Sequence, residues 1–434
     1  MTRSETGGKP SGAPSSGDPG LIRAAAHELY PELFRLYAKL HAEPELSGKE
    51  TVTAARIADE LRTVGFRVTE GVGGHGVVGV FENGPGPTVM VRADLDALPI
   101  GEKTGLPYAS SATGHLPGKG EVGVMHACGH DVHMTVLVGT ARLLTGCRET
   151  WRGTLLFIGQ PEEEIGAGAQ AMIDDGLFTR FPRPDCALTL HVAPSLAAGT
   201  VGYREGLFWA GCASLDLLIR GIGGHGSRPH ETRDPVVMAA ETILLLQTIV
   251  SRETDPSETA VLTVGSIHGG SKGNIIPEEV LLQVNYRYFS TETDRLLRAA
   301  IERTARGVAL AAGMPEDRMP IVTDQYTGPP VYNDPALTRR VAGALRRVLG
   351  EEKVIRTERW TFSDDFSRFG LVEPRIPLCY FLLGTAGSGD GAPGTTQGSA
   401  FPGIHNPGFS PLPEPTITAG VQAMTAAVLE ALQG

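Results

Sequence analysis

The stretch TVMVRADLDALP, residues 88–99, joins a predicted strand to two carboxylates. Its first half, 88–93, is largely apolar, as expected of a strand that is buried on both faces of a sheet. Further strands of this kind are predicted at 155–159 and 187–190, and a helix is predicted at 132–144. This alternation of strands and helices predicts an α/β fold, in which helices cover both faces of a sheet.

The same pattern continues towards both ends of the chain. Residues 21–41 are predicted to be helical with a break at Pro31, and 50–64 follow as an amphipathic helix. The later elements of this pattern are a helix capped by Asn333, a strand at 376–383 and a last helix that starts near Pro415.

The middle of the chain has a different order of elements, β-α-β-β-α-β, which is typical of a ferredoxin-like unit. Its elements are a strand at 213–220, a helix from Asp234-Pro235 to about Val250, strands at 260–268 and 279–288, a helix at 291–312 and a strand at 320–324. Because this unit is complete in itself, we predict an inserted domain of residues 210–326. The α/β domain is then discontinuous and consists of 21–209 and 327–434.

The composition indicates a globular protein that does not bind nucleic acid. The chain has 434 residues, enough for two domains, and 41% of them are hydrophobic. The net charge of −11, without a long basic run, argues against nucleic acid and anionic membrane surfaces as partners. No apolar run of about 18 residues is present, so no membrane span is predicted.

Cysteine usage and the low-complexity segments add three expectations. Five cysteines at scattered positions argue against a disulfide framework and favour a reducing, cytoplasmic compartment. Residues 1–20 are rich in Gly, Ser and Pro and lack an apolar signal region, so they are predicted to be a disordered leader. The Gly/Ser/Thr stretch 384–399 is predicted to be a mobile loop.

The segment MHACGHDVHM, residues 125–134, has the highest density of potential metal ligands. It contains His126, Cys128, His130, Asp131 and His133. Thiolate, imidazole and carboxylate groups are the side chains that hold divalent transition metals. One histidine here could simply belong to a cluster that caps the following helix, but five candidate ligands in so short a segment favour a metal site.

Other polar groups follow the predicted strands. Asp94 and Asp96 come after the strand at 88–93, Glu162, Glu163 and Glu164 after the strand at 155–159, and His191 after the strand at 187–190. In open α/β sheets, ligands bind beyond the carboxyl ends of the strands. The glutamates could instead lie in a solvated loop and Asp94 in a turn, but adjacent carboxylates repel one another and favour a nearby cation.

Taken together and in order, several motifs resemble the family of dinuclear-metal aminoacylases and carboxypeptidases. Within it, the resemblance is to the amidohydrolase branch that includes hippurate hydrolase and indole-acetyl-amino-acid hydrolase. The motifs span almost the whole chain after the leader: HAEPELS (41–47), RADLDALP (92–99), HACGHD (126–131), QPEEEIGAGA (160–169), LHV (190–192), GGHGSRPH (223–230), GNIIP (273–277), DDFS (364–367) and GIHNPGF (403–409).

This resemblance implies a zinc-peptidase-like sheet with two divalent metal ions, zinc or manganese, with cobalt or nickel also suitable. Cys128 stands where a thiolate bridges the two metals. His130 and His191 would complete one metal site, and Glu164 and His405 the other. Glu163 would be the general base, and Asp96 would orient a ligand from behind the metal site.

The resemblance also assigns residues of the inserted domain, which would serve as lid and dimerisation domain of a homodimer. His225 would reach into the active site of the partner subunit and act in catalysis, and Asn274 and Arg287 would bind substrate. An Arg and an Asn suit a carboxylate, and an imidazole facing a carbonyl oxygen could stabilise an oxyanion. The residues alone equally allow a strand arginine, a turn asparagine and a histidine of a Gly-rich loop.

The chain departs from the usual family pattern at three places. Glu162 replaces a small residue before the predicted base, and Asp364 stands where the branch commonly has Glu. A long Gly/Ser-rich segment also precedes His405. None of these departures removes a predicted ligand.

The predicted function is hydrolysis of the amide bond of a small N-acyl amino acid by metal-activated water, with Glu163 as general base. A metallo-carboxypeptidase or dipeptidase on the same scaffold is the alternative within the enzymes. A dimeric binding protein without activity is a third hypothesis, and the complete set of predicted ligands argues against it.

Overall fold

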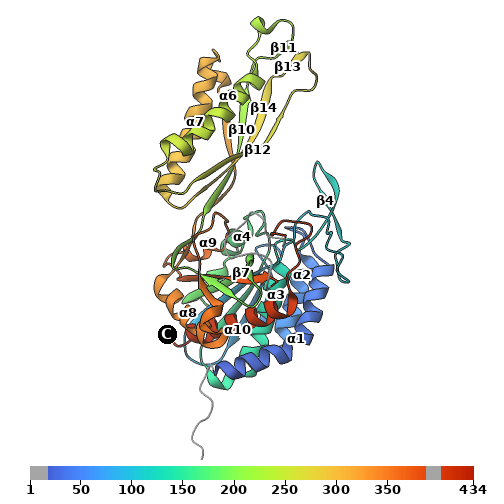
Figure 1. Cartoon of the computed structure of the whole chain (residues 1–434), viewed down its shortest axis with the longest axis vertical. Coiled ribbons are helices and arrows are strands. Elements are labelled where there is room, and N and C mark those ends of the chain that lie inside the picture. Colours follow the sequence, from blue (N-terminus) through green and yellow to red (C-terminus); the bar gives the residue numbers. More distant parts are fainter. Residues whose placement is uncertain (1–17, 388–401) are drawn as a thin grey trace, which may run out of the picture.

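The computed structural model describes residues 18–387 and 402–434. Most of the predicted leader, 1–17, and most of the predicted loop at 384–399 therefore lie outside the described residues. The described part forms a lower body around a large sheet and an upper unit, residues 211–328, that stands on the body through a narrow neck (Figure 1).

The body contains an eight-stranded mixed sheet with the order β1-β2-β6-β3-β7-β18-β8-β17. Its central strands β6, β3, β7 and β18 run parallel to one another, whereas β1 and β2 are antiparallel additions at one edge. The strand bounds are β1 Arg67–Val72, β2 Gly76–Glu82, β3 Thr88–Asp94, β6 Thr154–Gln160, β7 Cys186–Ala197, β8 Val201–Tyr203, β17 Val354–Arg356 and β18 Leu378–Ala386.

Helices cover both faces of this sheet because its central strands are apolar on both sides. In β3, Val89 and Val91 pack into one core cluster, and Met90 between them packs into a cluster on the other face. The predicted α/β class with helices on both faces is confirmed. The first face is covered by α1 Pro19–Ala42, α2 Thr51–Thr63, α3 His130–Gly146, α8 Pro335–Leu349 and α10 Pro413–Ala431, and the second by α4 Gly168–Asp174, α5 Leu177–Arg180 and α9 Ser367–Gly370.

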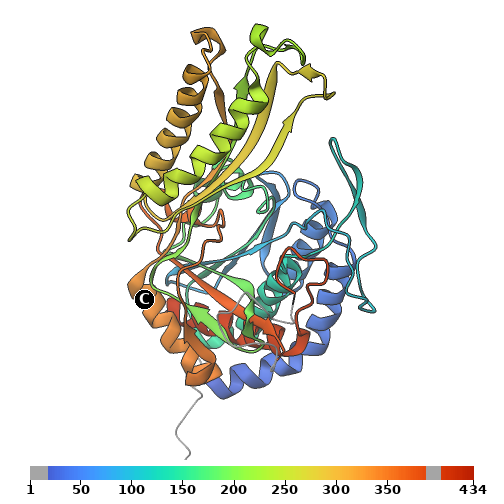
Figure 2. The same cartoon turned by 45° about the horizontal axis from the view of Figure 1, so that its top comes forward.

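The upper unit has its own sheet and its own core. The sheet order is β12-β14-β10-β15 with antiparallel neighbours, and two helices lie side by side on one face (Figure 2). Along the chain the order is β-α-β-β-α-β. The elements are β10 Gly211–Arg220, α6 Pro235–Thr248, β12 Val261–Gly269, β14 Glu279–Tyr288, α7 Thr291–Ala311 and β15 Ile321–Gly328, with a small pair of β11 Gly224–His225 and β13 Ile275–Ile276.

Smaller elements complete the structure. The hairpin of β4 and β5 projects from the body (Figure 1). A separate short pair, β9 with β16, is formed by the segments that flank the upper unit in the sequence. These are β4 Thr113–Leu116 with β5 Gly120–Gly123, and β9 Gly206–Trp209 with β16 Val331–Asn333; short helical turns are Arg148–Thr150, Pro229–Glu231, Ile249–Glu253, Glu316–Arg318 and Glu351–Lys353.

Several boundaries differ from the prediction. α1 starts at Pro19 and continues through Pro31 without a break, because buried side chains such as Leu33 and Tyr37 hold the helix against the body. Asn333 is not a cap: its amide bonds two backbone carbonyls, and Asp334 caps α8 by accepting from the Leu337 amide at 2.8 Å. Tertiary packing therefore overrides these local signals.

Strand lengths were also predicted too short. β7 continues to Ala197, so His191 lies inside the strand rather than at its end. β18 continues to Ala386, which shortens the predicted loop at its start. By length and composition alone, the helical segment Pro235–Glu253 is long and apolar enough to cross a membrane; its mean hydropathy is 1.3 and 33% of the window is buried. Apolar helices of ordinary folded cores pass the same test.

Candidate metal centre and active site

The parallel strands bring the predicted polar residues to one edge of the sheet. β3 ends at Asp94, β6 ends at Gln160, and β7 carries His191. α3 starts beside this edge at His130, directly after Gly129. Gly129 has φ 79°, in the left-handed region that favours glycine, and a side chain there would collide with Val192 at 2.5 Å. This close turn sets Cys128 next to the strand.

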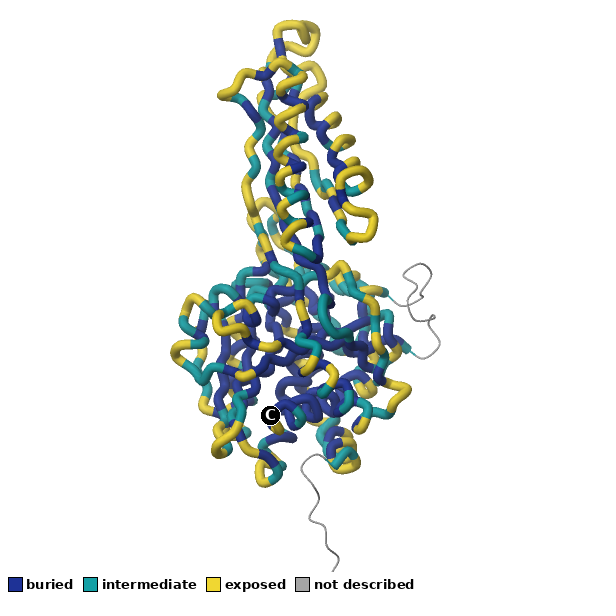
Figure 3. Tube along the Cα trace, turned by 90° about the vertical axis from the view of Figure 1, so that its left-hand side faces the viewer, coloured by how far each residue is buried: buried dark blue, intermediate teal, exposed yellow. Residues whose placement is uncertain are grey.

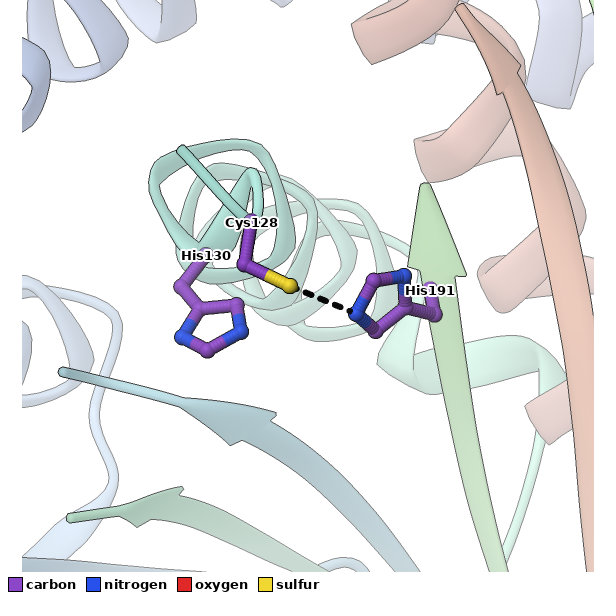
Figure 4. A group of neighbouring side chains, drawn as sticks. All are labelled: Cys128, His130 and His191. Atoms are coloured by element: carbon purple, nitrogen blue, oxygen red, sulfur yellow. Dashed lines mark hydrogen bonds between the residues drawn. The ribbon is translucent and has the colours of Figure 1, made fainter. Parts of the chain in front are cut away.

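Cys128 is the centre of the candidate metal site. Its Sγ lies 3.3 Å from His191 Nε2. It also lies 3.3 Å from Nε2 of His405, a residue far along the chain. Figure 4 shows Cys128 and His130 at the start of α3 facing His191 on β7. His405 Nε2 in turn lies 3.5 Å from Glu164 Oε1. The structure therefore brings all five predicted ligands into two adjoining groups that share the thiol.

The orientation of these side chains fits a bound cation. His191 Nδ1 lies 2.8 Å from its own strand at Val192 O, and His130 Nδ1 lies 2.8 Å from Asp96 O, so both Nε2 atoms face the centre. His130 Nε2 and Glu164 Oε1 are buried, and among the described residues neither has a hydrogen-bond partner. Buried polar atoms are rarely left unpaired. A metal ion would satisfy both, and the backbone contacts on Nδ1 are those that orient metal-binding histidines.

Electrostatics makes this site dependent on a cation. Burial, followed by the charges of Glu164 and Glu163, raises the pKa of the Cys128 thiol well above its usual value. The thiol is therefore protonated until a metal displaces the proton. Thiolate and imidazole ligands suit zinc, and the carboxylate also admits manganese, cobalt or nickel.

Glu163 lies between the candidate ligands and a second group of acids, with its Oε2 4.0 Å from His130 Nε2. Its carboxylate forms a group with Asp364 and Asp365. Burial, followed by the charge of Asp364, raises the pKa of Glu163 well above its usual value, and burial raises the pKa of Asp365 to about 7. In this desolvated position a carboxylate is a stronger base than in water, which suits proton transfer.

Arg92 compensates this acidic group, and sequence reasoning did not single it out. Its guanidinium lies 2.8 Å from Asp94, 3.0 Å from Asp364 and 3.3 Å from Asp365. Asp364, the departure from the family pattern, also accepts from the Tyr380 hydroxyl at 2.7 Å. The sequence did contain a signal for this residue: Arg92 lies within an otherwise largely apolar predicted strand, and a buried arginine needs anionic partners.

Asp96 lies where a ligand-orienting residue is expected. Its Oδ2 accepts from the Glu164 amide at 2.9 Å and from the Ser47 hydroxyl at 2.7 Å. His133, by contrast, is not available as a ligand although it lies nearby. Its Nδ1 lies 2.6 Å from Asp94, and its Nε2 accepts from the Val192 amide at 3.0 Å. Both of its ring nitrogens are thus used within the protein.

Residues 90–430 match the family described as peptidase family M20/M25/M40. The chain belongs to this family. It is 35% identical to N-acetyl-L-cysteine deacetylase of Bacillus subtilis, over 83% of this chain and 82% of that protein. It is 33% identical to an IAA-amino acid hydrolase of Arabidopsis thaliana, over 83% of this chain and 78% of that protein.

A solved structure of the same family resembles the whole chain. The dinuclear metal-binding peptidase of the M20 family from Bacillus subtilis superposes with a TM-score of 0.73 at 28% identity, covering 94% of this chain and 99% of that one. The chain is thus a hydrolase of the M20 family, and its relatives support metal-dependent hydrolysis of amide bonds.

The predicted substrate residues of this M20 hydrolase lie outside the metal centre of the same chain. His225 and Asn274 are exposed on and beside β11 and β13, at the end of the upper unit that is farthest from the body (Figure 1). Arg287 lies on β14 near the neck and donates to the Ser363 hydroxyl at 2.6 Å. Within one chain, none of the three joins the five candidate ligands, because the upper unit stands away from the sheet edge.

Proposed function

We propose that this hydrolase cleaves the amide bond of a small N-acyl amino acid and binds two divalent metal ions. The observation that carries the proposal is the thiol of Cys128, 3.3 Å from one imidazole on β7 and 3.3 Å from another near the last helix. A thiol shared by two ligand groups supports a dinuclear site. His130 and His191 are proposed for one ion, and Glu164 and His405 for the other.

The bound metal would lower the pKa of a water and polarise the scissile carbonyl. Glu163 is proposed as the general base: its carboxylate, in a side chain that is 10% exposed, takes a proton from the attacking water and passes it to the leaving nitrogen. Asp96 holds the backbone of Glu164 at 2.9 Å and so keeps that carboxylate in place while Glu163 acts. Both glutamates lie about as far from His130, at 4.0 Å for Glu163 and 3.9 Å for Glu164. The division of roles is supported by their other neighbours, because Glu164 lies 3.5 Å from His405 and Glu163 groups with Asp364 and Asp365.

The substrate class is proposed from the charged and polar groups of the upper unit. Arg287 and Asn274 suit the carboxylate of an amino-acid leaving group. His225 is exposed and its Nδ1 accepts from the Ser227 amide at 3.1 Å, which leaves Nε2 free to face a carbonyl oxygen. This arrangement is completed only if a second subunit brings His225 to the metal centre.

We propose a homodimer through residues 210–326, supported by an apolar face that α6 presents to solvent. Leu244 is 71% exposed, Val237 54% and Leu245 46%, and Ile267 on the edge strand β12 is 52% exposed. Figure 3 shows this exposure along the upper unit, in contrast to the buried body. Large apolar patches mark contact surfaces, and a second copy of the chain gives the commonest symmetric contact.

The location is proposed to be cytoplasmic. All five cysteines lie in the described residues and none forms a disulfide. This supports a reducing compartment.

The proposal is tested by elemental analysis coupled to an activity panel. The purified protein, saturated with zinc or manganese, is assayed on N-acetyl and N-benzoyl amino acids and on dipeptides with a free amino group. We expect about two metals per chain and turnover of the acylated compounds. Cys128→Ala should lower both occupancies together, because both groups use this thiol. One metal per chain at full activity would contradict the dinuclear site, and preference for free dipeptides would favour a dipeptidase.

A further inference from the structure

We propose that Glu50 is a positioning residue whose buried carboxylate holds the turn that carries Glu163 and Glu164. The inference rests on the proposed roles of these two residues. Glu50 precedes α2, far in sequence from the turn, and no role was predicted for it. Its contact with the turn gives it one.

The turn after β6 has an unusual backbone. Glu162 has φ 56°, in the left-handed region that residues other than glycine rarely adopt. Its carbonyl accepts from the amides of Ala167 at 3.1 Å and Gly168 at 3.3 Å, which closes the turn on one side. A strained residue persists only where its surroundings hold it. Because this residue directly precedes Glu163, its conformation sets the direction in which the proposed base points.

Two carboxylates hold the turn from the other side. The Glu162 amide donates to Glu50 Oε1 at 2.9 Å, and the Glu164 amide donates to Asp96 Oδ2 at 2.9 Å. These bonds fix the residues on either side of Glu163. Hydrogen bonds to an ionised acceptor are stronger than those between neutral groups. Asp96 therefore anchors the proposed ligand, and Glu50 anchors the strained residue before the base.

The position of Glu50 fits this role better than that of a helix cap. The residue is 0% exposed and lies at the N-terminus of α2, yet its side chain makes no capping bond to that helix. The capping bonds come from Glu45, which accepts from the amides of Val52 at 3.2 Å and Thr53 at 2.7 Å. Burial of a carboxylate is unfavourable unless it makes specific contacts. Oε1 of Glu50 makes the contact to the turn, and Oε2 is buried without a hydrogen-bond partner among the described residues.

Close packing leaves little freedom between the two segments. A side chain at Gly48, which has φ 73°, would approach Glu162 Oε1 at 2.8 Å. Without the Glu50 carboxylate, the Glu162 amide is left without its acceptor and the left-handed residue can relax. Glu163 then moves relative to the metal centre, and a displacement of this kind lowers turnover by up to about 100-fold.

The experiment uses graded variants of the full-length protein and two readouts. Glu50→Gln keeps an oxygen that can accept from Glu162, whereas Glu50→Ala removes it; Glu45→Gln is the matched control in the same segment. Hydrogen exchange over residues 160–168 is measured in the metal-free protein, and kcat, KM and metal content are measured in the loaded protein. Glu162→Gly and Glu162→Ala are each combined with Glu50→Ala, because glycine accepts the positive φ and alanine does not.

For Glu50→Ala we expect faster exchange at 160–168, a kcat lower by about 10- to 100-fold, and KM and metal content close to those of the unsubstituted protein. The exchange rate and kcat of Glu50→Gln should lie between those of Glu50→Ala and those of the unsubstituted protein. Glu162→Gly should recover part of the lost kcat and Glu162→Ala should not. Glu45→Gln should change exchange only in α2.

Unchanged exchange at 160–168 and unchanged kcat in Glu50→Ala would overturn the inference and leave the proposed function standing. Faster exchange confined to α2, without rescue by Glu162→Gly, would overturn it in favour of a role in helix stability alone. If Glu163→Gln keeps full turnover while Glu50→Ala loosens the turn, the proposed base is wrong, and the role of Glu50 in holding the turn is still supported.

Discussion

The body and the upper unit differ in which side chains they bury. The body buries charged groups: Arg92 is 2% exposed, and Asp94 and His130 are 0% exposed. The upper unit does the reverse and exposes apolar side chains such as Leu244, at 71%. Buried charges need partners, and the body supplies them except at the centre of the candidate metal site. The body is therefore organised around a polar site with candidate metal ligands, whereas the upper unit presents an apolar surface to solvent.

The largest expected effect tests the body. Glu163→Gln keeps the shape of the side chain but cannot accept a proton from water. We expect kcat to fall by about 10²- to 10⁴-fold with metal content preserved, which is the usual contribution of general acid–base catalysis. Glu164→Gln should instead lose one metal, because a neutral amide is a poorer ligand than a carboxylate.

Paired metal analysis and turnover for the two variants separate the roles. Loss of metal in Glu163→Gln, with retention in Glu164→Gln, would show that the two roles are reversed. Mild effects in both variants would show that the glutamates belong only to a loop.

The candidate ligands could be predicted from the sequence because their signal is local. Parallel strands end at one edge of a sheet, so residues after strands converge whatever the exact strand length. His191 illustrates this: it lies inside β7 rather than at its end, and it still faces Cys128 at 3.3 Å. The cluster of histidines in residues 125–134 could also be predicted, because these candidate ligands are close together in the sequence.

The network behind the ligands could not be predicted in the same way. Arg92, Asp365 and Tyr380 lie on separate elements, and their contacts depend on which strands are neighbours and on side-chain directions. Pro31 shows the same limit, since local propensity predicts a break and packing against the body keeps the helix intact. A contact between the upper unit and a second subunit, as proposed, would be a property of an assembly, which no local pattern encodes.

The second prediction tests whether the upper unit acts on another subunit. His225→Ala should lower kcat by about 10²-fold if the imidazole stabilises an oxyanion. Mixing this variant with Glu163→Gln under conditions that exchange subunits should then restore activity. Half of the dimers would be mixed and each would hold one intact site, which gives about a quarter of the original activity for a symmetric contact.

Absence of any recovery after confirmed subunit exchange would show that His225 does not act across subunits. Each variant treated alone through the same exchange procedure is the control.

The third prediction concerns the exposed face of α6. Leu244→Lys places a charge at the centre of the proposed contact and should shift the protein from dimer to monomer at micromolar concentration, measured by light scattering. The monomer should lose turnover to the same degree as His225→Ala, since it has no partner to supply the imidazole. Leu371→Lys, at a body position that is 45% exposed, is the matched control and should stay dimeric. A fully active monomer would contradict both the dimer and the cross-subunit role.

The smallest expected effect on turnover comes from a buried charge that contacts none of the five candidate ligands directly. His41 is 1% exposed, and its ring nitrogens lie 2.7 Å from Asp131 and 3.0 Å from Glu102. Burial opposes the charge on this ring, but the hydrogen bonds to Asp131 and Glu102 outweigh it and raise the pKa of His41 to about 10. Both carboxylates have further donors, Val132 and Ser110, which favour their ionised form.

This shift makes the stability of the body depend on pH. The pKa of His41 in the folded protein is above that of an unfolded histidine, about 6.5, so its contribution is complete below that pH and is lost as the pH rises towards 10. The stability difference between the unsubstituted protein and His41→Gln, measured by thermal unfolding without metal, should therefore shrink between pH 6.5 and 9.5, by at most about 1.4 kcal/mol per pH unit. His230→Gln is the control in the upper unit, where the side chain is 70% exposed and should make no such difference. A constant difference for His41→Gln across this range would mean that the ring is neutral.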